Sequence, residues 1–145
     1  MKKLTLLILL LHMAFCVGAN NKFDYKRYKA ELVKYITNKA CLTQAEAAKF
    51  FPVYNEMQQK QRVLFNELKK NRRVKPASDA EYKKVIRRHC ELEIQIKEVQ
   101  QQYHNKFLKI LPAKKVYDVI KAEDRFHREA FKKLMKQKSK QNNKK

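Results

Sequence analysis

The side chains closest to a metal or catalytic site in this sequence are those of His89-Cys90-Glu91, with Glu93 one helical turn after His89. Imidazole, thiolate and carboxylate groups are the usual ligands of zinc, but a structural zinc site needs four of them close together. His89 also falls on a predicted inward-facing stripe, which favours an interfacial histidine. We therefore expect no bound metal, with His89, Cys90 and Glu93 as weak candidates only.

The same cluster offers a cysteine beside a histidine, as a nucleophile and its base would be. Neighbouring residues on a helix point about 100° apart, so Cys90 and His89 do not face each other. The only glycine is Gly18. Phosphate-binding loops, dinucleotide-binding turns and nucleophile elbows need the backbone angles that glycine supplies. We expect neither an enzyme nor a cofactor.

The first nineteen residues have the pattern of a cleaved signal peptide. Lys2 and Lys3 precede an apolar run over residues 4–11, and Val17-Gly18-Ala19 fits a cleavage site. The alternative of a lipoprotein would use Cys16, where Phe15 replaces the preferred small residue. Cleavage after Ala19 would leave 126 of the 145 residues and +19 of the +21 formal charge, as one domain in the bacterial periplasm.

Apolar residues recur at three- and four-residue spacing in four segments, which predicts an all-α fold. The predicted helices cover residues 24–37, 43–70, 78–108 and 112–135, and residues 136–145, which lack apolar side chains, are predicted to be a disordered basic tail. The predicted inward-facing residues are, helix by helix, Tyr25, Tyr28, Leu32, Tyr35 and Ile36; Ala47, Phe50, Tyr54, Met57, Gln61, Leu64 and Leu68; Tyr82, Val85, His89, Leu92, Ile96, Val99 and Tyr103; and Val116, Val119, Ile120, Phe126, Ala130 and Leu134.

Two long helices joined by a short connection predict a long antiparallel hairpin, into which all four helices would be built. Thr43 and Glu46 can form a capping box at the start of the second helix. Pro52 should bend that helix. The hairpin would separate Cys41 from Cys90 by about 27 Å, too far for an internal disulfide, although an intermolecular one remains possible. The thin core of such a hairpin favours a homodimer.

The charge balance predicts negatively charged partners. The chain has 35 Lys and Arg against 14 Asp and Glu, an excess larger than solubility requires. Export would remove the protein from the cytoplasmic nucleic acids, and no nucleic-acid recognition motif is present. Acidic polypeptides, lipopolysaccharide and anionic lipid headgroups remain as partners.

Two short motifs resemble those of a known family. Leu42-Thr43-Gln44-Ala45-Glu46 and, about seventy residues later, Leu111-Pro112-Ala113-Lys114-Lys115 are similar to the paired LTxxQ motifs of the Spy/CpxP family of periplasmic stress proteins. Glu46 replaces Gln in the first motif, and Pro112 and Lys115 replace Thr and Gln in the second. The resemblance implies a four-helix hairpin, dimerised into a curved cradle, that acts as an ATP-independent chaperone or envelope-stress modulator.

The predicted client-binding residues combine basic charge with aromatic rings off the main stripes. They are Phe51, Arg62, Phe65, Lys69, Lys70, Arg72, Arg73, Arg87, Arg88, Phe107 and Phe131. For each phenylalanine, burial in the dimer interface or against the first helix is an equal alternative. The rival functions are zinc sensing, since the family contains zinc-responsive members, and a scaffold that binds an anionic envelope surface through its basic tail.

Overall fold

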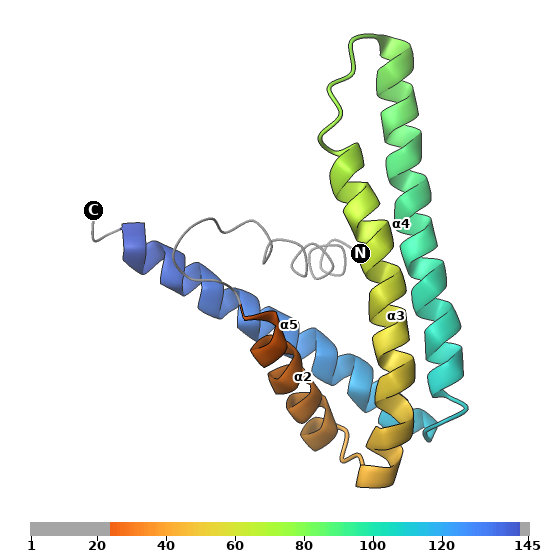
Figure 1. Cartoon of the computed structure of the whole chain (residues 1–145), viewed down its shortest axis with the longest axis vertical. Coiled ribbons are helices and arrows are strands. Elements are labelled where there is room, and N and C mark those ends of the chain that lie inside the picture. The colour runs from red at the N-terminus through yellow and green to blue at the C-terminus, as the bar shows by residue number, and fades with distance from the viewer. Residues whose placement is uncertain (1–23, 143–145) are drawn as a thin grey trace. The chain divides into compact units, whose positions relative to one another are not determined.

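The computed structural model describes residues 24–142, except for the side chains of residues 137, 138, 141 and 142. Within this range the chain forms four α-helices and no strand (Figure 1): α2 Tyr25–Lys39, α3 Gln44–Asn71, α4 Asp79–Phe107 and α5 Ala113–Asn142. The all-helical prediction is confirmed. The predicted signal peptide lies outside the described residues.

The helices form two compact units. In one unit α3 packs against α4, and in the other α2 packs against α5. The α3–α4 unit covers residues 44–112 and the α2–α5 unit is built from the two flanking segments of the chain. The sequence pattern identifies which face of each helix is buried, but it does not say that the first helix takes the last one as its partner.

In the α3–α4 unit the two helices run antiparallel. The Asn71 side-chain amide donates to the Val85 carbonyl at 3.0 Å, and Arg88 pairs with Glu67 at 2.6 Å. At about 1.5 Å per residue each helix is roughly 42–44 Å long. The buried side chains, which form the core of this unit, are Phe50, Tyr54, Met57, Gln61, Phe65 and Leu68 of α3 and Leu92, Ile96, Tyr103 and Phe107 of α4.

The start of α4 departs from the prediction. Ser78 caps the helix by accepting from the Glu81 backbone N–H at 3.3 Å. Tyr82 was predicted to face inward, and this is wrong, because its side chain is 54% exposed. The reason is the end of α3 at Asn71, which lies opposite Val85. No turn of α3 remains to cover the first turn of α4.

The beginning of α3 lies where the sequence places it. The helix starts at Gln44, directly after Thr43. The acidic Glu46 lies in its first turn, where its negative charge interacts favourably with the positive end of the helix dipole. Pro52 lies inside α3, which is continuous through it to Asn71. The capping box of Thr43 and Glu46 and the bend at Pro52 stay predictions.

In the α2–α5 unit the helices are also antiparallel. The Tyr28 hydroxyl contacts His127, and Lys115 donates to the Cys41 carbonyl at 3.1 Å near the opposite end of α2. The buried residues include Leu32 and Ile36 of α2 and Val116, Val119, Ala122 and His127 of α5. α5 continues to Asn142, whereas the sequence predicts disorder from residue 136. Residues 136–142 contain no apolar residue, but Lys and Gln, which make up most of this segment, are good helix formers.

Cys41, two residues after the end of α2, has a left-handed backbone conformation. The Cys41 backbone has φ 48°, its N–H donates to Asn38 O at 3.4 Å, and the Leu42 N–H donates to Thr37 O at 3.0 Å. These two bonds form a Schellman motif, whose left-handed position is usually glycine. A side chain with a Cβ atom adopts this conformation at a cost of about 1–2 kcal/mol.

Cys41→Gly is therefore expected to stabilise the α2–α5 unit. Glycine relieves the backbone strain, but its greater entropy in the unfolded chain offsets part of this gain. The net increase in the free energy of unfolding should be about 0.5–1 kcal/mol. Urea unfolding followed by far-UV circular dichroism measures it. Cys41→Ala is the control, since it removes the thiol and keeps the strained Cβ; an equal gain in that variant would contradict the backbone explanation.

Candidate binding surfaces

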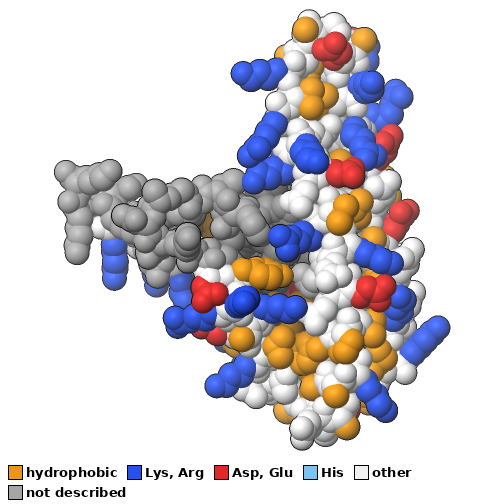
Figure 2. All heavy atoms as spheres, viewed as in Figure 1, with side chains coloured by type: hydrophobic (Ala, Val, Ile, Leu, Met, Phe, Trp, Pro, Cys, Tyr) orange, Lys and Arg blue, Asp and Glu red, His pale blue; other side chains and the backbone are white. Residues whose placement is uncertain are grey.

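The predicted cationic residues of the α3–α4 unit lie at its surface. Figure 2 shows Lys and Arg side chains across the visible face of this unit, with hydrophobic side chains between them. The exposed members are Arg62, Lys70, Arg72, Arg73 and Arg87, whereas Lys69 and Arg88 are half-buried. Arg88 is held by Glu67 at 2.6 Å and by Glu91 at 3.5 Å. Lys69, Lys70, Arg72 and Arg73 lie at the end of α3 and in the connection that follows it.

Two of the predicted aromatic contact residues belong to the core instead. Phe65 is 4% exposed and Phe107 is 1% exposed, so neither can meet a partner. The Phe107 ring lies 4.8 Å from that of Phe50 and 6.4 Å from that of Tyr54, measured between ring centroids. Phe51 and Phe131 are half-buried. The prediction is wrong for Phe65 and Phe107 because rings this large widen the buried stripe of each helix beyond its central positions.

Apolar side chains that the sequence reasoning missed are exposed on α4. Tyr82, Ile86, Cys90 and Ile94 follow at four-residue spacing, and residues so spaced lie next to one another on a helix surface. We call them the α4 apolar row. Ile86 is 62% and Ile94 is 58% exposed. The signal in the sequence was an isoleucine pair off the inward stripe.

Cations adjoin the α4 apolar row. Lys83 and Arg87 precede Ile86 and Cys90 of the row by three residues, a spacing that places each of them beside the row on the helix surface, and both are exposed. Lys83 pairs with Asp79 at 2.7 Å. On α3, Val63 is also exposed and lies next to Arg62 in the sequence. α4 thus presents exposed apolar side chains with positively charged side chains beside them.

The predicted metal candidates do not come together as a site. His89 Nε2 lies 3.3 Å from Glu93 Oε1, in the geometry of a pair one turn apart. Cys90 is exposed with a free thiol, as is Cys41. Among the described residues no group of three or more His, Cys, Asp or Glu side chains is arranged to hold a metal ion.

A buried polar cluster in the α2–α5 unit was not predicted. The Tyr28 hydroxyl of α2 lies 2.6 Å from His127 Nδ1 of α5, and His127 Nε2 lies 3.6 Å from Glu123 Oε1. When the hydroxyl donates to Nδ1, the proton of the neutral imidazole is on Nε2 and faces the carboxylate. The Phe126 ring meets Tyr28 edge-on, at 5.3 Å between centroids. The cluster joins α2 to α5.

Tyr28 is a poor nucleophile or base in this position. Burial, with a smaller contribution from the negative charge of Glu123, raises the pKa of the Tyr28 hydroxyl well above its ordinary value. The phenolate, which such chemistry would need, is therefore disfavoured. The arrangement fits a structural link between two helices.

The paired leucines of the two sequence motifs occupy similar positions in the sequence relative to the helices that follow them. Leu42 and Leu111 are buried, and each lies two residues before a helix begins, at Gln44 and Ala113 respectively. Pro112, between Leu111 and α5, is exposed. In both motifs a buried leucine anchors the chain ahead of a long helix.

No helix in the described part of the chain has an apolar stretch long enough to cross a lipid bilayer. No family model, curated protein or solved structure matches the chain.

Proposed function

We propose that this chain is an exported, ATP-independent chaperone that holds unfolded or partly folded proteins on the surface of its α3–α4 unit. The single observation that carries the proposal is the α4 apolar row with cations beside it. An unfolded chain offers apolar side chains and, where it is acidic, negative charge. Both can be met on this surface without a deep pocket.

The electrostatic part of the proposal concerns the rate of capture. A positive surface speeds the encounter with acidic clients, and salt screens it, because the Debye length falls from about 10 Å at 0.1 M to about 3 Å at 1 M. The apolar row then holds the client by burying area, which salt does not screen. No step requires a nucleotide, a metal or a reaction at a side chain.

The resemblance to the Spy/CpxP family supports the same proposal. It adds a periplasmic location after cleavage near Ala19, a homodimer, and a cradle in which the four helices form one long hairpin. Curvature from Pro52 would increase the area that one client touches. These features belong to the proposal together with the chaperone activity.

The test is light scattering by an acidic protein that unfolds and aggregates when its disulfides are reduced, with and without this protein and with no nucleotide. We expect suppression near stoichiometric ratio. Ile86→Ser with Ile94→Ser should require about thirtyfold more protein for equal suppression, because each exposed isoleucine contributes on the order of 1 kcal/mol when a client covers it.

A matched control uses exposed apolar residues of the other unit. Tyr117 and Met135 of α5 are 59% and 50% exposed. Tyr117→Ser with Met135→Ser should suppress aggregation as the natural protein does. Scattering curves that coincide with and without the natural protein would remove the chaperone proposal. Equal losses in the two double variants would remove the α4 apolar row from it.

A further inference from the structure

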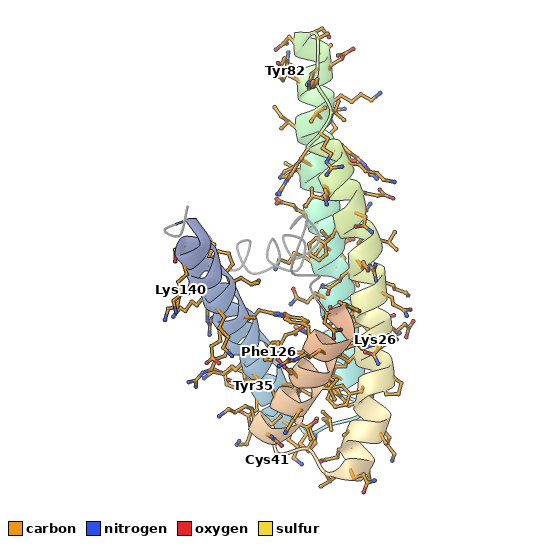
Figure 3. The ribbon with its side chains drawn as sticks, turned by 60° about the vertical axis from the view of Figure 1, so that its left-hand side comes forward. Lys26, Tyr35, Cys41, Tyr82, Phe126 and Lys140 are labelled. Atoms are coloured by element: carbon orange, nitrogen blue, oxygen red, sulfur yellow. The ribbon has the colours of Figure 1, made fainter. Side chains whose placement is uncertain are left out.

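The α2–α5 unit contains an open groove that the proposed chaperone activity does not use. Its volume is about 560 Å³, within the range of small-molecule sites. Tyr35 and Lys39 of α2 form one side, and the other side is formed by Asp118, Lys121, Ala122, Arg125, Arg128, Glu129 and Lys132 of α5. Figure 3 shows Tyr35 on α2 facing α5, near Phe126.

The lining of the groove is strongly positive. Five cationic side chains and two carboxylates contribute to it, a formal excess of three positive charges. Both carboxylates already have cationic partners: Asp118 accepts from Lys114 at 2.8 Å, and Glu129 accepts from Arg125 at 2.9 Å. Arg128 pairs with Asp124, outside the lining, at 3.9 Å. Since Lys114 also lies outside the lining, the charges of Lys39, Lys121 and Lys132 are not offset by the carboxylates of the groove.

The cations of α5 are spaced so that they can meet several anionic groups of one ligand. Residues 121, 125, 128 and 132 follow one another by three or four positions, so they lie on one face of the helix. At about 1.5 Å per residue this row is roughly 16 Å long. Lys39, from α2, adds a positive charge on the opposite side.

Phosphate groups suit this lining better than other anions. The guanidinium groups of Arg125 and Arg128, each of which uses part of its donors on Glu129 or Asp124, keep further N–H donors that fit phosphate oxygens, and three ammonium groups supply charge at single points. A groove of this volume can hold several phosphates on one ring, and each phosphate brings up to about two negative charges to the cations where a peptide carboxylate brings one. The half-buried Tyr35 ring gives the carbon skeleton of such a ligand an apolar face.

We propose that the α2–α5 groove binds a compact ligand with several phosphate groups on a sugar or cyclitol ring, either free or as a lipid headgroup. This site is separate from the α4 apolar row, so loss of one function leaves the other. A groove variant should suppress aggregation as the natural protein does, which keeps the two proposals distinguishable.

Calorimetric titration with inositol hexakisphosphate in 0.1 M NaCl tests the site, with the protein expressed with its own N-terminal segment. We expect one ligand per chain. Lys121→Gln with Arg128→Gln should weaken binding at least about tenfold, because each removes a charge-assisted contact. Both side chains are exposed, so helicity and melting temperature should not change.

Lys26→Gln with Lys29→Gln is the matched control. It also removes two positive charges, from exposed positions of α2 that do not line the groove. Binding of the phosphate probe should weaken less than about threefold, because salt screens the effect of charges that do not contact the ligand. Equal weakening by the two double variants, or no measurable binding to the natural protein, would overturn the proposal.

Two further titrations identify the source of the ligand. Vesicles of phosphatidylcholine with a phosphorylated inositol lipid should bind, and lose binding in the groove variant, if the ligand is a headgroup; binding of the soluble probe alone supports a free ligand. Hexaglutamate is the comparison for acidic peptides. Binding of hexaglutamate as tight as that of the phosphate probe would overturn the assignment of phosphate.

Discussion

Replacing Phe107 with alanine is expected to lower the free energy of unfolding of the α3–α4 unit by about 3–5 kcal/mol. The ring is 1% exposed and packs against Phe50 and Tyr54. Alanine would remove this contact area and leave a cavity between two helices. A domain of this size has a total stability of about 5–15 kcal/mol, so the loss is a large share of it.

Urea unfolding followed by far-UV circular dichroism measures this loss. Ile86→Ala is the control in the same unit, since its side chain is 62% exposed and surface substitutions usually change stability by less than about 0.5 kcal/mol. The interpretation of Phe107 from sequence, as a client contact, predicts the reverse: full stability with weakened capture of clients. That result would contradict the core position of the ring.

The helices themselves were predictable because local signals agree with the periodic pattern. Asp24 caps α2 by accepting from the Arg27 backbone N–H at 3.0 Å, Ser78 caps α4, and α5 begins directly after Pro112. Each of these residue types is preferred at the start of a helix. The C-terminal end of α5 at Asn142 was not predictable from the apolar pattern, because residues 136–142 contain no apolar residue.

The width of the buried face was underestimated from sequence. Phe65 lies four residues after Gln61 and Phe107 lies four residues after Tyr103, both of which are buried stripe residues. Neighbours at this spacing share a helix face, and a ring at the edge of the stripe reaches the core by rotation of its side chain. Spacing alone does not distinguish this outcome from exposure.

The polar cluster and the groove of the α2–α5 unit depend on contacts between distant parts of the sequence. Tyr28 and His127 are 99 residues apart, and the groove combines residues 35 and 39 with residues 118–132. A periodic pattern gives the face of a helix but not its partner, so neither feature could be predicted. The cations around 69–73 and 83–88 could be placed at the surface, because charged side chains are rarely buried without partners.

Above pH 10 the natural protein is expected to lose stability relative to Tyr28→Phe. The folded state raises the pKa of Tyr28, whereas tyrosine in the unfolded chain titrates near pH 10. Below that pH both states keep the proton. Above it the unfolded state releases the proton and the folded state retains it, so each further pH unit favours unfolding by up to about 1.4 kcal/mol until the folded state also ionises.

The difference between the two proteins isolates this effect, because the lysines and the other tyrosines titrate in both. At pH 8 the variant should be the less stable by about 1–2 kcal/mol, since it removes the partner of the His127 imidazole. By pH 11.5 the two free energies of unfolding should be equal, or the variant should be the more stable protein. Urea unfolding across this pH range measures it, with Tyr117→Phe, exposed on α5, as the control that follows the natural protein. A difference in the free energy of unfolding that stays constant from pH 8 to pH 11.5 would mean that folding does not raise the pKa of the Tyr28 hydroxyl.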